Sequence, residues 1–208
     1  MIIILFVCII IPLSLGLFFM QGRAREMTLF MEIGIFVCLL AAYINGFLAS
    51  VIDMTRSDLT YFLTPFTEEV LKALPIVFFV FLFRPEKSRI INNAIMVGIG
   101  FAILENAYLM ASAAGDVTIS WAFIRGLGAG MMHGICTLIV GCGLTFVYVR
   151  RKLSIVGTYA LLIGAIVYHA SYNLLIQSSY RIFGILIPIA TVIPACLLLN
   201  SQKKRAKK

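Results

Sequence analysis

Seven apolar runs, each close to the length that crosses a bilayer, constrain this chain more than any other feature. They lie at residues 2–20, 28–52, 64–83, 90–113, 118–149, 155–176 and 182–200. A transmembrane helix needs about 20 apolar residues, because each residue adds about 1.5 Å across a hydrocarbon core about 30 Å thick. With 62% hydrophobic and 12% charged residues, the chain is not an ordinary soluble domain. We predict an all-α, polytopic membrane protein, a bundle of about seven transmembrane helices.

Basic residues gather after alternate runs. Thirteen Lys or Arg residues follow the first, third, fifth and seventh runs, whereas the other connections carry only Arg56 and Arg181. Because cytoplasmic loops carry an excess of Lys and Arg, this bias predicts a cytoplasmic C-terminus and an N-terminus outside. The net charge of +8 is then a topology signal, and we expect no nucleic-acid partner. We divide the chain into one integral-membrane domain at 1–202, with core motifs at 60–175, and a basic cytoplasmic tail at 203–208.

The third run begins at residue 64 and contains the pattern Glu68-Glu69-x-x-Lys72 near its start. This pattern places three ionisable side chains in a membrane helix. A charged residue near the bilayer centre costs roughly 2.5–3.5 kcal/mol on insertion scales, so it needs a partner or a purpose. Lys72 follows Glu68 by four residues and Glu69 by three, so all three share one helical side. We expect Thr64 to cap this helix, with the carboxylates in its opening turns. A capped ion pair near the membrane surface is the structural alternative.

Further polar residues lie inside the apolar runs, and they are Glu105, Asn106, Tyr108, Arg125, His133, His169 and Asn173. Both histidines of the chain are therefore intramembrane. At about 1.5 Å per residue from the outer end of each helix, four ionisable side chains lie roughly 7–22 Å deep. These four are Glu68, Glu105, His133 and His169. We expect their carboxylate and imidazole atoms to lie within about 4–8 Å of a common point, the reach of shared water or metal ligation.

Each of these residues has a structural explanation when it is taken alone. Glu105 could be an isolated neutral carboxylic acid, and Arg125 could be its counter-charge. His133 alone is more often a hydrogen-bonded core histidine, and His169 with Asn173, four residues apart, could make an interhelix hydrogen bond. Three carboxylates, two histidines and an amide at similar depths are hard to attribute to structure alone. We therefore favour a functional site.

The chemistry of this set indicates activation of water. A carboxylate in a dry pocket can take a proton from water, and His and Asn N–H groups can stabilise the oxyanion formed when that water attacks a carbonyl. Alternatively, the set could hold a zinc ion, which lowers the pKa of bound water to about 7. The side chains that could hold Zn²⁺ are Glu68, Glu105, His133 and His169, and we expect no other cofactor. No HExxH sequence is present, so the most specific zinc-protease pattern is missing.

Four motifs, in this order along the chain, resemble those of the PrsW family of intramembrane proteases. They are Glu68-Glu69-x-x-Lys72, Phe101-x-x-x-Glu105-Asn106-x-Tyr108, Arg125 followed by His133, Thr137 and Gly141, and His169-x-x-x-Asn173. That family is similar to the CAAX prenyl endopeptidases and the bacteriocin-processing enzymes. Lys72 stands where the CAAX enzymes have an arginine one position later, and Glu105 stands where they have a histidine, which favours PrsW. The resemblance covers about residues 60–175.

The resemblance implies a role for each site residue. The catalytic set would be Glu68, Glu69, Glu105, His133, His169 and Asn173, supported by Lys72, Arg125 and Tyr108. Glu68 would be the general base that activates water. Glu105 would be a second water or metal ligand, and His133 a further ligand or proton carrier. His169, together with the asparagine four residues later, would stabilise the oxyanion.

We predict an intramembrane endopeptidase, multi-pass in a bacterial-type inner (cell) membrane, that cuts a membrane-anchored protein near the extracytoplasmic side. The catalytic type, glutamic or metallo, stays open. The resemblance implies regulated proteolysis, for example of an anti-sigma factor. Two other classes are kept: a non-catalytic membrane scaffold of the same fold, which one subunit of gamma-secretase resembles, and an ion-coupled transporter. A transporter usually shows inverted repeats or paired broken helices, and the sequence shows neither.

Overall fold

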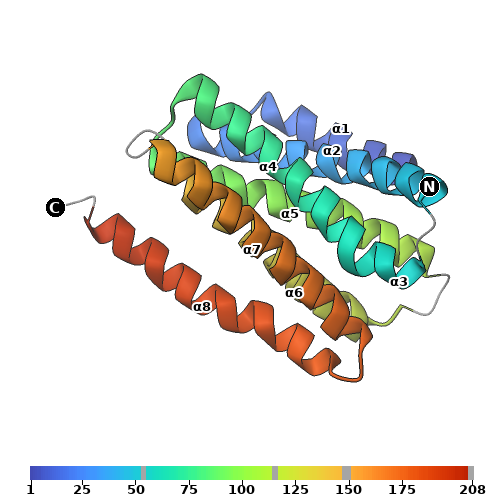
Figure 1. The fold of residues 1–208 in the computed structure, drawn as a ribbon. Helices are drawn as coiled ribbons and strands as arrows, with labels where there is room; N and C mark the ends of the chain where they lie inside the picture. The colour runs from blue at the N-terminus through green and yellow to red at the C-terminus, as the bar shows by residue number, and fades with distance from the viewer. Residues whose placement is uncertain (53–54, 114–116, 147–150, 206–208) are drawn as a thin grey trace.

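The computed structural model describes the chain except for residues 53–54, 114–116, 147–150 and 206–208. The described part is all-helical, as predicted, and each apolar run forms one long helix (Figure 1). The long helices are α1 (Ile2–Leu17), α2 (Gly22–Val51), α4 (Thr64–Phe83), α5 (Lys87–Ser112), α6 (Ile119–Leu144), α7 (Arg151–Gln177) and α8 (Arg181–Arg205). A short α3 (Arg56–Asp58) and a π-helical segment η1 (Leu59–Leu63) join α2 to α4.

Four of the described helices are long and apolar enough to cross a membrane: α2, α5, α6 and residues Ile155–Gln177 of α7. The helix α4 has sufficient length, but its three ionisable residues remove it from that set. Apolar segments of α1 and α8 are shorter. The seven-span count and the orientation of the termini stay predictions. In the predicted tail, residues 203–205 continue α8, and residues 206–208 lie outside the described part.

The helices form a bundle in which α5 lies between α2 and α6. Figure 1 shows α1 and α2 at one edge and α8 at the opposite edge, where α8 packs against α6 and α7. Between these edges, α4 contacts α2, α5, α6 and α7. This central position of α4 allows its polar side chains to meet residues from α5, α6 and α7.

A close approach between α5 and α6 positions the first histidine. A Cβ atom on Gly98 would overlap the backbone carbonyl oxygen of His133, so only glycine permits this spacing. Small residues at helix interfaces allow membrane helices to come this close. The fold therefore uses Gly98 to bring the backbone of His133 against α5.

We expect Gly98→Ala to lower the thermal unfolding temperature of the purified protein in detergent. The added methyl group must push α5 from α6, and overpacking of this kind costs about 1–3 kcal/mol. Gly130→Ala on α6 is the matched control, because a Cβ atom there meets nothing within 4 Å. The control should unfold at the wild-type temperature or slightly above it, because alanine is a better helix former. Equal unfolding temperatures for the two variants would contradict the close-packing argument.

The start of α4 differs from the prediction. Thr64 is not the N-cap: helical backbone precedes it in η1, and the cap position falls on Leu63, whose side chain makes no capping bond. The Thr64 N–H donates to the Leu59 carbonyl, five residues back. Pro65 follows and has no N–H to donate, so a wide π turn stands where a helix start was predicted. The two glutamates consequently lie inside a longer helical segment.

Candidate active site

A buried ion pair on α4 is the centre of the polar cluster. Lys72 is fully buried, and its Nζ donates to Glu69 Oε1 at 2.5 Å. The same ammonium donates to His133 Nδ1 of α6 at 2.8 Å. Because an ammonium can only donate, His133 Nδ1 is the acceptor and the ring proton lies on Nε2. Lys72 therefore sets the tautomer of His133.

The histidine of α7 is held from the other side of the same carboxylate. His169 Nδ1 lies 2.7 Å from Glu69 Oε1, and since an ionised carboxylate only accepts, the ring nitrogen donates. His169 Nε2 is then directed to Glu68, whose Oε2 lies 3.9 Å away. Within the described residues, Glu68 Oε2 is buried without a hydrogen-bond partner. Glu69 thus orients the histidine through its Oε1, and its own Oε2 is, like Glu68 Oε2, buried without a partner in the described residues.

The network continues from His133 toward the start of α6. His133 Nε2 donates to Glu105 Oε2 of α5 at 3.0 Å, and Arg125 Nη2 lies 2.9 Å from the same oxygen. The Glu105 and Arg125 side chains are 24% and 20% exposed, whereas His133 is fully buried. This end of the network is therefore its most accessible part.

An aromatic residue lines the network. The Lys72 ammonium lies 4.3 Å from the centre of the Phe101 ring, and that ring lies 5.0 Å from the His133 ring. A cation over an aromatic face is stabilised by the ring quadrupole, more strongly where water is excluded. Phe101 belongs to the motif that contains Glu105, but nothing in the sequence predicts that its ring contacts Lys72. The structure gives it the role of covering the ammonium.

The structure brings Glu68, Glu105, His133 and His169 together, as their matching depths predicted. Within the described residues, neither Asn173 nor Tyr108 makes a side-chain hydrogen bond to that network. The Asn173 amide donates to the Thr60 carbonyl of η1 at 3.3 Å, and Tyr108 is 36% exposed on α5. Asn173 therefore contacts the π turn that precedes the two glutamates.

The polar contacts that α2 makes with α1 and α4 are not among the sequence predictions. Glu32 is buried, accepts a hydrogen bond from Ser14 of α1 at 3.1 Å, and is an acidic residue inside an apolar run. That position within the run is a signal that could have found it. Thr67 of α4 donates to Asn45 of α2. These contacts tie α1 to α2 and α2 to α4.

The charges in the cluster do not balance. Glu69 pairs with Lys72, and Glu105 pairs with Arg125, which leaves the Glu68 carboxylate without a cation of its own. An uncompensated charge is costly to bury. Glu68 therefore carries a proton, faces a protonated His169 or faces a bound cation, and each state suits a group that activates water.

The donor set fits a metal ion. One ligand atom from each of Glu68, His133 and His169 lies within 4.8 Å of the others, and all three residues are buried. Zinc takes imidazole nitrogens and carboxylate oxygens as ligands. Glu69 accepts a hydrogen bond from His169 Nδ1, the ring nitrogen that would not bind the metal. A carboxylate is a usual partner for that nitrogen of a metal-binding histidine. His133 has both ring nitrogens in hydrogen bonds, so it would have to exchange one of them.

Comparison with known proteins identifies the family of the chain. Residues 23–199 match the protein family described as PrsW family intramembrane metalloprotease. No curated protein matches the chain, and no solved structure does. The matched range includes every residue of the network and every helix that carries it. The chain therefore belongs to the PrsW family of intramembrane metalloproteases.

Proposed function

We propose that this protein is an intramembrane endopeptidase in which Glu68 is the general base for the attack of water on a peptide carbonyl. One observation carries the assignment: Glu68 Oε2 is buried, accepts no hydrogen bond from a described residue, and faces His169 Nε2 at 3.9 Å. Its neighbour Glu69 has its Oε1 occupied by Lys72 and His169. Glu69 Oε2 is also buried without a partner, but the two bonds to its Oε1 fix the orientation of that carboxylate. Glu68 is held by no such bond from a described residue, so we assign it as the carboxylate that contacts water.

In the proposed mechanism, Glu68 accepts a proton from the attacking water and can pass it to the leaving amine. His169 donates its Nδ1–H to Glu69 in a hydrogen bond, so its Nε2 is the atom that can act on the substrate. When Nε2 also carries a proton, it can donate to the oxyanion, and Glu69 offsets the positive charge of that imidazolium. Asn173 stays a predicted oxyanion donor, for which its amide would have to turn from the Thr60 carbonyl.

Glu68, His133 and His169 are the residues that would hold a metal ion. When bound, the ion would polarise the scissile carbonyl and lower the pKa of bound water. In that state Glu68 would be a metal ligand instead of the free base, and Glu69 would still orient His169. Glu105 stays an additional predicted ligand, and in the structure it accepts hydrogen bonds from His133 and Arg125.

The proposed substrate is a membrane-anchored protein, since a site built between membrane helices is reached by a chain that lies in the same membrane. The family resemblance implies that the substrate is a regulatory protein such as an anti-sigma factor, and that its cleavage is regulated. The excess of basic residues after alternate runs supports a cytoplasmic C-terminus, and we propose the cell membrane as the location. In that orientation the Glu68 end of α4 faces the extracytoplasmic side.

Incubating the purified protein with candidate single-span membrane proteins, with and without a zinc chelator, tests this function. We expect cleavage by the untreated protein. Loss of cleavage with the chelator, and recovery when Zn²⁺ is returned, would assign Glu68, His133 and His169 to a metal ion. In that case elemental analysis should find about one zinc ion per chain, the stoichiometry of a single catalytic site. Cleavage that persists at full rate in metal-free protein would reject the metal and keep the glutamic mechanism. Failure to cleave any candidate, with zinc present and the protein folded, would count against the protease itself.

A further inference from the structure

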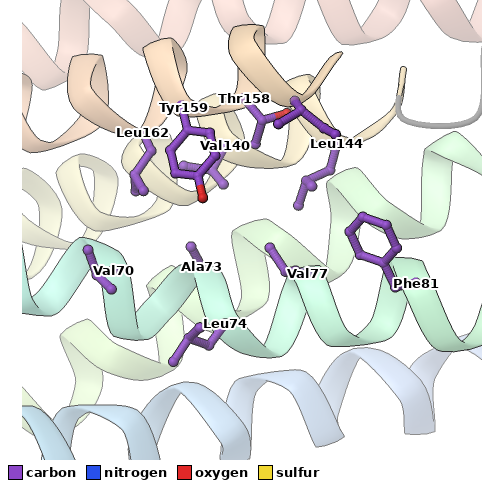
Figure 2. A pocket seen from close by; sticks show the side chains of 11 residues that line it. Val70, Ala73, Leu74, Val77, Phe81, Val140, Leu144, Thr158, Tyr159 and Leu162 are labelled. Atoms are coloured by element: carbon purple, nitrogen blue, oxygen red, sulfur yellow. The ribbon is translucent and has the colours of Figure 1, made fainter. Parts of the chain in front are cut away.

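An apolar cavity of about 420 Å³ lies between α4, α6 and α7, beside the polar network. From α4 it is lined by Val70, Ala73, Leu74, Val77 and Phe81. Figure 2 shows Ala73, Val77 and Phe81 on the side of α4 that faces Leu162, Tyr159 and Leu144 across the opening. We call this space the α4/α7 groove. The proposed mechanism does not use it.

The groove continues the walls of the active site along both helices. On α4 its first residue, Val70, directly follows Glu69, and Ala73 lies one turn beyond that glutamate. On α7 the lining residue Leu162 lies seven residues before His169, which is two turns along the same helical face. The two helices that carry the glutamates and His169 therefore also carry the sides of the groove.

The dimensions of the groove match part of a membrane-spanning helix. From Val70 to Phe81 it extends along α4 for about 16 Å, at about 1.5 Å per residue. That is about half of a hydrocarbon core about 30 Å thick. The lining is almost entirely hydrocarbon, with polar atoms supplied by Thr158 and Tyr159 of α7. Figure 2 shows the Tyr159 hydroxyl directed toward α4.

We propose that the α4/α7 groove holds the transmembrane helix of the substrate, on the Phe83 side of the scissile bond. This inference rests on the proposed protease function. A lipid chain could enter an apolar groove anywhere on the bundle, but this groove leads directly from Glu69 and His169. A peptide lying in it would present its next residues to Glu68. The groove would then select substrates with large apolar residues just beyond the cleaved bond.

Narrowing the groove tests the proposal. Val77→Trp places a large ring between the two walls, and Leu82→Trp makes a similar enlargement at an exposed position of α4 outside the groove. We expect Val77→Trp to slow cleavage of a single-span substrate by tenfold or more, about the effect of one misfitting apolar group in a pocket. A short peptide with the scissile bond but no membrane segment should be cut at the wild-type rate by both variants. Equal slowing of both substrates, or no slowing of either, would overturn the groove assignment.

A cross-linking experiment reads binding without cleavage. A photoreactive amino acid is placed at position 77 or at position 82 in the Glu68→Gln protein, which is mixed in phospholipid vesicles with a peptide of 20 Leu and Ala residues flanked by lysines. We expect peptide adducts at position 77 and only lipid adducts at position 82. Only lipid adducts at both positions would identify the groove as a lipid site and reject the proposal.

The two experiments separate this proposal from the protease proposal. Peptide adducts at position 77 combined with no cleavage of any substrate by the wild type would keep the groove as a helix-binding surface and reject the protease. Cleavage of the short peptide combined with lipid adducts alone would keep the protease and reject the groove.

Discussion

We expect Glu68→Gln to abolish proteolysis while the protein stays folded and still binds its substrate. Glutamine has nearly the shape of glutamate, but its amide cannot accept the proton of the attacking water. General-base assistance is typically worth 10²–10⁴-fold, so the rate should fall by at least that factor. Glu68 Oε2 accepts no hydrogen bond from a described residue, and therefore the change breaks no contact that holds the helices together. The measurement is product formation from a single-span substrate, with thermal unfolding run in parallel.

Glu69→Gln is the matched control, one residue along the same helix. It should reduce the rate less, by about 10–100-fold, since it weakens the orientation of His169 and does not remove the base. It should also lower the unfolding temperature, because Lys72 loses its ion-pair partner. If the Glu68→Gln protein still cut at the wild-type rate, Glu68 would not be the base. A wild-type protein that forms a partner complex without any cleavage would favour the scaffold class.

The second large effect concerns the fold. We expect Lys72→Met to destabilise the protein by about 3–5 kcal/mol, the usual cost of removing one partner from a buried ion pair. Methionine fills a similar volume beside Phe101, but it leaves Glu69 without its cation and His133 Nδ1 without its donor. The measurement is the free energy of unfolding in mixed detergent micelles. Activity should fall together with stability, because the tautomer of His133 is no longer set.

Arg89→Met is the control for loss of a basic residue. Arg89 pairs with Glu26, and their side chains are 38% and 21% exposed, so this pair should contribute about 1 kcal/mol or less. The double variant Lys72→Met/Glu69→Gln should be more stable than Lys72→Met alone, since it also removes the unpaired charge. Unchanged stability in the Lys72→Met protein would show that the ammonium is not needed to assemble α4 with α6.

The helices were predicted well because hydropathy reports what the bilayer requires. The run at 64–83 coincides with α4, whereas α2 begins before the second run and α8 ends after the seventh. The fifth run also differs from its helix. That run was drawn to residue 149, whereas α6 ends at Leu144 with a turn after it. Apolar residues continue past the helix end, so hydropathy does not detect the turn. The missed π turn at 59–63 has a similar cause, since a proline after a threonine is also typical of an ordinary helix start.

The sequence predicts which residues form the site better than it predicts the contacts between them. Matching depths group Glu68, Glu105, His133 and His169 in one prediction. The Glu-Glu-x-x-Lys spacing predicts that Lys72 shares a helical side with both glutamates, and the structure pairs it with Glu69. Sequence spacing did not indicate that Lys72 would also donate to His133, or that Asn173 would contact η1. Such contacts depend on the rotation of each helix about its own axis, which depth does not specify.

The amino-acid sequence alone requires this chain to form membrane helices, because backbone N–H and C=O groups have no water to bond within a bilayer. It also requires the ionisable groups to meet one another, since single charges are costly in hydrocarbon. Packing between the helices decides the rest. The close approach at Gly98 positions His133 against α5. Lys72 and His169 hold Oε1 of Glu69, whereas no hydrogen bond from a described residue holds Oε2 of the neighbouring Glu68. Two adjacent and chemically identical glutamates thus differ only because their side chains point to different neighbours.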